Sequence, residues 1–130
     1  MLVKISFYFT LLLLVGCKDC SMDFTDNKFK VQNVSERNIM CFIKDSSNSI
    51  LTRESVKAHE INYIPLVNEY WSNILKNPYD FVVTIFVDDN WWMRTNDLRK
   101  LTDENILKKI ILMKKELDSL NWIVTYSENY

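Results

Sequence analysis

Residues 81–87 read Phe-Val-Val-Thr-Ile-Phe-Val and give the chain its clearest strand signal. A strand with one face in water carries polar residues at alternate positions, whereas this run is almost continuously β-branched or aromatic. The run therefore predicts a central strand that is covered on both faces, with the other elements arranged around it.

The residues before this strand predict further short strands. Residues 29–33 and 39–44 are two β-like runs, and the polar segment 34–38 between them predicts a hairpin. Residues 45–49 consist of Asp, Ser and Asn, which indicates a loop. Residues 50–59 fit either an edge strand or a surface loop.

A strand and a helix are expected between residues 60 and 77. Apolar residues alternate at Ile61 and Tyr63, which indicates a strand that ends before Pro65, because proline cannot donate to a central ladder. Asn68 is a suitable helix cap. The apolar residues that follow it have helical spacing, namely Tyr70, Trp71, Ile74 and Leu75.

The residues after the central strand predict helices and one closing strand. Thr95 or Asn96 opens a helix with an apolar face. Residues 110–113 fit either a helix or a short link, residues 114–120 predict a helix, and residues 122–126 predict a strand. The apolar face of the first of these helices consists of Leu98, Leu101, Ile106 and Leu107.

This order of elements predicts an α+β fold, with helices packed on a small mixed or antiparallel β-sheet. Helices join the strands at 81–87 and 122–126. We therefore expect these two strands to be parallel in one sheet, with a right-handed crossover between them.

The N-terminal residues carry an export signal. Lys4 precedes the uncharged run 5–15, which is shorter than the roughly 20 apolar residues that a bilayer span requires and fits a signal peptide. Residues 14–17 then read Leu-Val-Gly-Cys, which resembles the lipobox of bacterial lipoproteins. The resemblance implies cleavage before Cys17 and lipidation of its thiol. An ordinary signal peptide and an uncleaved anchor are the alternatives.

This export signal divides the chain into a signal peptide (1–16), a lipidated tether (17–28) and a single α+β domain (29–130). Removing residues 1–16 takes away one lysine and no acid, which leaves 15 basic against 17 acidic residues. This near-neutral balance argues against a nucleic-acid partner, which requires a basic face.

Three cysteines are present, at positions 17, 20 and 41. Cys17 and Cys20 have the spacing of a redox or metal motif, but an acylated Cys17 sulfur can serve neither purpose. An exported chain can hold a disulfide, so either Cys20 pairs with Cys41 or Cys41 is a buried free thiol.

Several short motifs resemble a group of small uncharacterised lipoproteins from Bacteroides and related bacteria. The resemblance rests on Asn33-Val34-Ser35, on residues 84–88 and 106–109, and on the C-terminal run 120–126, Leu-Asn-Trp-Ile-Val-Thr-Tyr. It implies an envelope lipoprotein of the outer membrane, and the pair Lys18-Asp19 resembles the signal for surface display. It implies no particular activity.

The strongest candidate for ligand contact follows the central strand directly. Asp88, Asp89 and Asn90 offer oxygens to a cation such as Ca²⁺, and Trp91 and Trp92 are residues that can stack on sugar rings. A calcium loop needs further acids at alternating spacing and a glycine, and this segment has neither. The alternative is a solvated turn at the two acids, with a tryptophan covering a helix end.

No residue pattern predicts catalysis or a cofactor. His59 is the only histidine, and a triad with Ser55 or Ser72 lacks the strained nucleophile turn that glycines provide. Zinc requires more Cys and His ligands than the chain offers. The basic run that includes Lys108 and Lys109 has acidic neighbours, which is typical of a solvated face.

We therefore expect a non-enzymatic binding or structural module of the cell envelope, held at the membrane by Cys17. Its expected partners are the membrane and an envelope protein or glycan. The rival hypothesis is a small envelope enzyme or a glycan-binding accessory that uses residues 88–92.

Overall fold

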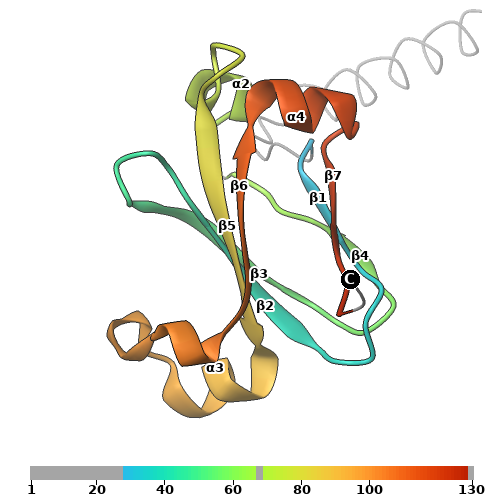
Figure 1. Cartoon of the computed structure of the whole chain (residues 1–130), viewed down its shortest axis with the longest axis vertical. Coiled ribbons are helices and arrows are strands. Elements are labelled where there is room, and N and C mark those ends of the chain that lie inside the picture. Colours follow the sequence, from blue (N-terminus) through green and yellow to red (C-terminus); the bar gives the residue numbers. More distant parts are fainter. Residues whose placement is uncertain (1–27, 67–68, 129–130) are drawn as a thin grey trace, which may run out of the picture.

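The strand at residues 81–88 lies inside a four-stranded antiparallel sheet, as the sequence predicts. A computed structural model describes residues 28–66 and 69–128. The sheet has the order β3-β2-β5-β6 (Figure 1). Its strands are β2 (Ile39–Lys44), β3 (Ile50–Val56), β5 (Phe81–Asp88) and β6 (Ile106–Met113).

Three shorter strands form a second sheet, with the order β4-β1-β7. These are β1 (Lys30–Asn33), β4 (Ile61–Tyr63) and β7 (Ile123–Tyr126). β1 pairs antiparallel with β4 and parallel with β7. The α+β class is confirmed, but the chain builds two sheets where the sequence analysis expected one.

Apolar clusters cover both faces of the four-stranded sheet, which confirms that β5 is central. The inner cluster joins the two sheets, because Val82 and Phe86 of β5 belong to it together with Val31 of β1 and Val124 of β7. The outer cluster lies on the opposite face and consists of Met40, Phe42, Ile85, Val87 and Trp92.

Short helices occupy the connections. They are α2 (Trp71–Ile74), α3 (Asp89–Thr95) and α4 (Lys114–Ser119), with 3₁₀ turns at Leu98–Lys100 and Asp103–Asn105. In α4 the carboxylate of Glu116 accepts the Met113 N–H at 3.2 Å, and Leu117 is fully buried. The predicted helix at 114–120 and the predicted strand at 122–126 are confirmed.

The predicted hairpin of residues 29–33 and 39–44 is wrong, because β1 and β2 belong to different sheets. The buried amide of Asn33 explains the change of sheet. Its Nδ2 donates to the carbonyls of Arg37 at 2.7 Å and Val56 at 3.1 Å, and its Oδ1 accepts from the Ser35 N–H and hydroxyl. These bonds hold residues 33–37 in a tight turn that leads the chain across the core.

The region between β5 and α4 also differs from the prediction. Residues 106–113 form β6 rather than a continuing helix, because they pair along the whole length of β5. α3 ends at Thr95, and Asn96 adopts a left-handed conformation, so neither residue opens a helix. The predicted parallel pairing of 81–87 with 122–126 is wrong too, since β7 lies in the other sheet.

Two further expectations concern the segment 50–77. Residues 50–56 form an edge strand, which settles the two alternatives for that region. The helix after it is a single turn, and Tyr70 occupies its cap position. Asn68, the expected cap, lies outside the described residues.

Left-handed backbone is frequent in the turns, and no glycine supplies it. Five described residues have positive φ: Asn48, His59, Asn96, Asn121 and Trp122. Asn121 and Trp122 form the corner between α4 and β7. The Trp122 ring lies 6.1 Å from Phe29 and 6.4 Å from Trp71, so this corner is held by aromatic packing.

Candidate functional site

Asp88 lies at the junction of β5 and α3, where it caps the helix. Its Oδ1 accepts the Asn90 N–H at 2.8 Å, as expected for an acidic residue at a helix N-terminus. Its Oδ2 accepts from Nη1 of Arg37 at 3.1 Å, and the same guanidinium donates to Glu128 at 2.8 Å. Asp88 thus ties α3 to the turn that follows β1.

Asp89 is next to Asp88 in sequence but has different partners. Its Oδ1 accepts from the Ser55 hydroxyl at 3.3 Å, and its backbone N–H donates to the carbonyl of Asn38. The two carboxylates that the sequence analysis grouped as ligands therefore have partners in different parts of the chain, Asp88 in the turn after β1 and Asp89 in β3. Among the residues that the structure describes, no three His, Cys, Asp or Glu side chains gather in a way that could hold a metal ion.

The two tryptophans of this segment differ in exposure. Trp92 is 7% exposed and packs edge-on against Phe42, with ring centroids 4.9 Å apart. The Arg53 guanidinium lies 5.2 Å from the centroid of the same ring. Trp91 is half-buried against the outer cluster. Trp92 therefore covers the sheet, and only Trp91 retains surface for a ligand.

His59 lies in the exposed turn after β3. Its Nε2 is 2.9 Å from Oε1 of Glu36, and its φ of 62° places it in the left-handed region. The Ser55 hydroxyl donates to Asp89, as described above. Ser72 is exposed on α2. The structure thus places the His59 ring beside the surface carboxylate of Glu36.

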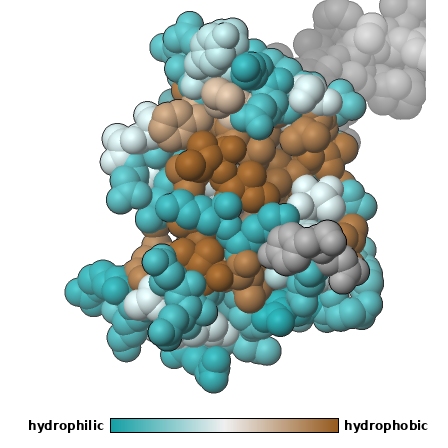
Figure 2. Space-filling view, viewed as in Figure 1, coloured by the Kyte–Doolittle hydropathy of each residue, from teal (hydrophilic) through white to brown (hydrophobic). Residues whose placement is uncertain are grey.

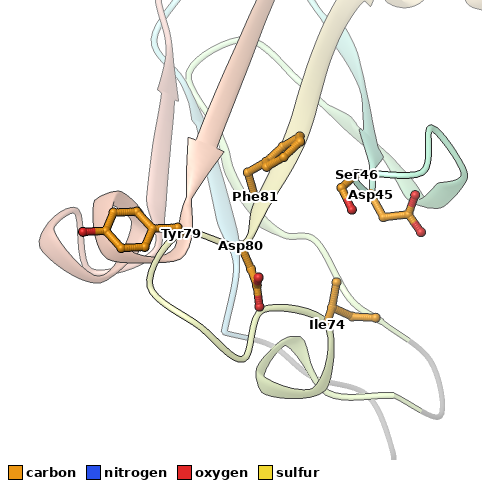
Figure 3. A pocket seen from close by; sticks show the side chains of 6 residues that line it. All are labelled: Asp45, Ser46, Ile74, Tyr79, Asp80 and Phe81. Atoms are coloured by element: carbon orange, nitrogen blue, oxygen red, sulfur yellow. The ribbon is translucent and has the colours of Figure 1, made fainter.

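A cavity that the sequence analysis missed opens at the other end of β5. It has a volume of about 220 Å³ and is lined by Asp45, Ser46, Ile74, Tyr79, Asp80 and Phe81 (Figure 3). Asp45 and Asp80 are far apart in sequence and come together because Lys44 of β2 pairs with Val83 of β5. No local motif marks such a site.

Both carboxylates of this cavity stabilise their own loops. Oδ1 of Asp45 accepts the N–H groups of Ser47 and Ser49, each at 2.9 Å. The hydrogen bond from the Ser47 hydroxyl, together with these backbone bonds, lowers the pKa of Asp45. Oδ2 of Asp80 accepts the N–H groups of Lys76 at 2.9 Å and Asn77 at 2.8 Å. The second oxygen of each carboxylate is outside these bonds.

The aromatic residues of the cavity point in different directions. Figure 3 shows the Tyr79 ring turned away from Asp45 and Ser46, whereas the Phe81 ring extends toward their side of the view. Tyr79 is 70% exposed, and the ammonium group of Lys115 lies 4.9 Å from its ring centroid. Phe81 and Ile74 thus provide the apolar part of the cavity.

The cysteines fall in two groups. Cys17 and Cys20 lie outside the described residues, whereas Cys41 is a fully buried free thiol in the inner cluster. Burial, and secondarily the charge of Glu54, raises the pKa of the Cys41 thiol far above its ordinary value. The thiol is therefore protonated and unreactive in the folded protein.

Within the described ranges, no helix is both long and apolar enough to span a bilayer. A scan against protein-family models found no match, and searches of the curated proteins and of the solved structures found no significant match either.

Proposed function

We propose that this chain is a lipid-anchored, non-enzymatic binding or structural module of the cell envelope. The observation that carries the proposal is the lipobox-like sequence at residues 14–17, at the end of the uncharged apolar run 5–15. Each buried methylene of an acyl chain contributes about 0.8 kcal/mol, and two or more chains give stable attachment. Residues 18–27 then link the anchor to Lys28, and at roughly 3.3–3.6 Å per residue they keep the domain within about 40 Å of the membrane.

The partners of the titratable side chains support a binding role. General acid–base catalysis needs a titratable group within hydrogen-bond reach of a substrate proton. Asp88, Asp45 and Asp80 instead accept bonds from the N–H groups of their own turns, and His59 faces Glu36 in an exposed turn. These groups stabilise local structure.

Metabolic labelling with a clickable fatty acid tests the anchor. We expect label on the wild-type chain and none on Cys17→Ser, which retains its apolar N-terminus. Equal labelling of the two proteins would contradict the proposal. Protease treatment of intact cells, with Lys18→Ala and Asp19→Ala as the variants, then tests surface display at the outer membrane.

Pull-down from detergent-solubilised envelopes tests the binding role. We expect the full-length chain to retain an envelope protein or glycan that an unrelated lipoprotein with the same signal sequence does not retain. Recovery of the same set of molecules with both baits would leave a purely structural module.

Glycan binding is a second candidate, favoured by the cavity at Asp45 and Asp80. Sugar sites combine an apolar surface with a few polar groups that orient the hydroxyls, and here Phe81 and Ile74 line the same cavity as the two carboxylates. Substituting Ser46→Trp would fill the cavity without touching either carboxylate. We expect the wild-type chain to be retained on an envelope-glycan array and this variant not to be retained. Equal retention of the two proteins would exclude the cavity as the sugar-binding site.

A further inference from the structure

The three-stranded sheet has one face that the rest of the described chain leaves exposed. In β1 the side chains of Val31 and Asn33 are buried in the molecule, so those of the alternate residues point outward. The same alternation holds in β4 and β7, which pair with β1 on either side. We call the six outward residues the outer face: Lys30, Gln32, Ile61, Tyr63, Ile123 and Thr125.

Apolar side chains are prominent on the outer face. Ile61 and Tyr63 are each 51% exposed, and Ile123 is half-buried. Lys30 lies between Tyr63 and Ile123 in the sheet, and its Nζ is 5.0 Å from the centroid of the Tyr63 ring. Leu120, in the turn that leads into β7, is 46% exposed. Exposed apolar side chains that gather on one face among polar groups are typical of an interaction surface.

The chain enters the domain at this sheet. Lys28 lies two residues before β1, the central strand of the sheet, and its Nζ is 4.3 Å from the centroid of the Trp122 ring. The Lys30 N–H donates to the Trp122 carbonyl at 2.9 Å, which fixes the start of β1 to the corner between α4 and β7. The proposed anchor at Cys17 therefore brings this end of the outer face closest to the bilayer.

The opposite end of the molecule has a different surface. α3 lies at the end away from α4 and from the start of β1 (Figure 1). Figure 2 shows mainly hydrophilic residues at the α3 end of the visible face, whereas apolar surface gathers below α4. This distribution favours an orientation in which α3 points into water and the start of β1 points toward the membrane.

We propose that the outer face rests on the bilayer interface, where the lipid headgroups meet the acyl chains. The side chains of Ile61, Ile123 and Leu120 enter this interface. The Tyr63 ring lies at the level of the headgroups, where tyrosine is enriched in membrane proteins. Lys30 has a long apolar stem, so its ammonium group reaches the lipid phosphates. None of the six residues of the outer face is acidic, so the face does not repel anionic lipids.

The anchor makes a small contact surface sufficient. Residues 18–27 keep Lys28 within about 40 Å of the membrane. Contact of the outer face with the bilayer is then an intramolecular step with a high effective concentration. Without an anchor, a few exposed side chains would hold the domain on a vesicle only weakly. The inference gives the anchored domain an orientation, and it rests on the proposed function for the anchor itself.

Tryptophan quenching by brominated lipids tests the contact. Full-length Tyr63→Trp is reconstituted into phosphatidylcholine vesicles with either plain or dibrominated acyl chains, and the emission of full-length wild type in the same vesicles is subtracted. We expect dibrominated chains to lower the remaining emission at least twofold. Met93→Trp, at a 72% exposed position of α3, is the matched probe, and its remaining emission should be equal in the two kinds of vesicle.

A charge in the outer face should break the contact. In Tyr63→Trp combined with Ile61→Asp, brominated lipid should no longer lower the emission, because a buried carboxylate is unfavourable. Tyr63→Trp combined with Ile111→Asp has the same change at an exposed position of β6 and should be quenched as before. Circular dichroism checks that each variant is folded. Equal emission of Tyr63→Trp in both kinds of vesicle, or quenching that persists with Ile61→Asp, would overturn the proposal.

Two further measurements separate this inference from its alternatives. In plain vesicles, Tyr63→Trp emission that changes with the number of chains per vesicle would show that a second copy covers the outer face. Emission that changes when soluble envelope proteins are added would show a protein partner, and either result would overturn the proposal. Fatty-acid labelling of the same samples tests the anchor on its own. Labelled chains without quenching refute the membrane contact alone, whereas quenching of unlabelled chains refutes the anchor alone.

Discussion

The two outer strands of the four-stranded sheet, β3 and β6, differ in how the rest of the chain covers them. β3 leads into β4 of the second sheet, and side chains bond across the gap. Nδ2 of Asn62 donates to the Ser55 carbonyl at 2.8 Å, and the Thr52 hydroxyl donates to the Pro65 carbonyl at 2.9 Å. Among the residues that the structure describes, β6 pairs with β5 alone and leads into α4 at one end. The comparison teaches that one sheet can have a closed polar edge, here β3, and an open apolar edge, here β6. Which edge is closed depends on which connection crosses between the two sheets.

The largest expected effect comes from the core that supports both edges. Phe86 of β5 is fully buried in the inner cluster and stacks near Tyr126, with ring centroids 5.2 Å apart. Phe86→Ala should lower the free energy of unfolding by about 3–5 kcal/mol, because it removes buried area and leaves a cavity. Urea unfolding followed by circular dichroism measures this change. A loss below about 1 kcal/mol would show that the two sheets do not share a core.

Asn33→Ala removes the buried hydrogen bonds of the Asn33 amide at the end of β3. The substitution leaves the Val56 and Arg37 carbonyls and the Ser35 hydroxyl without their buried amide partner. We expect a loss of roughly 2–3 kcal/mol, since unsatisfied buried polar groups are costly. Val34→Ala, at an exposed neighbouring position, is the control and should remain near wild type. Similar values for the two variants would contradict the role given to Asn33.

Asn62→Ala tests the closed edge directly. Removing one side-chain bond to Ser55 should destabilise the protein by about 0.5–1.5 kcal/mol. In this variant the backbone amides of β3 should exchange faster than in wild type, at rates that approach those of β6, as measured by native-state hydrogen exchange. Ile111→Thr is the matched change on β6 and should alter stability by less than about 0.5 kcal/mol, because its side chain is mainly exposed. If exchange at β3 is unchanged, Asn62 does not protect that edge.

The smallest expected effect concerns α4, which joins β6 to β7. Hydrogen bonds from Lys114 at 2.9 Å and Trp122 at 2.8 Å lower the pKa of Asp118 below its ordinary value of 3.8. A carboxyl whose folded-state pKa is lowered stabilises the fold above the unfolded value, and this contribution is lost as the pH falls through the folded value. The Tm of wild type should therefore drop more than that of Asp118→Asn between about pH 5 and about pH 2. Parallel Tm curves for the two proteins would refute this linkage.

Local pattern was sufficient for elements with a distinct period or cap. Residues 81–87 are continuously apolar because two clusters cover them, and residues 114–120 carry an acid three residues after Met113 that completes a helix start. β6 escaped prediction because Leu98, Leu101, Ile106 and Leu107 also fit a helical face. What makes Ile106 and Leu107 part of a strand is the vacant side of β5, a long-range contact that neighbouring residues do not encode.

The candidate sites show the same limit. A carboxylate after a strand can face solvent, bind a cation or cap a helix, and only the placement of Arg37 and the Asn90 N–H gives Asp88 its role. The cavity at Asp45 and Asp80 depends on the register of β2 against β5. Neither the register nor the side on which a chain crosses between sheets follows from local composition.

The left-handed corner at Asn121 and Trp122 has a consequence for the unfolded chain. Residues 17–130 contain no glycine, so each left-handed turn strains an ordinary residue, by about 1–2 kcal/mol where the side chain offers no compensation. A glycine would relieve that strain, but it would also give the denatured ensemble more conformational freedom, worth about 0.4–1 kcal/mol per site. At Trp122 it would in addition remove the indole that packs on Phe29 and Trp71. A glycine-free chain thus begins folding with less backbone entropy to lose, which offsets the strain that its turns retain.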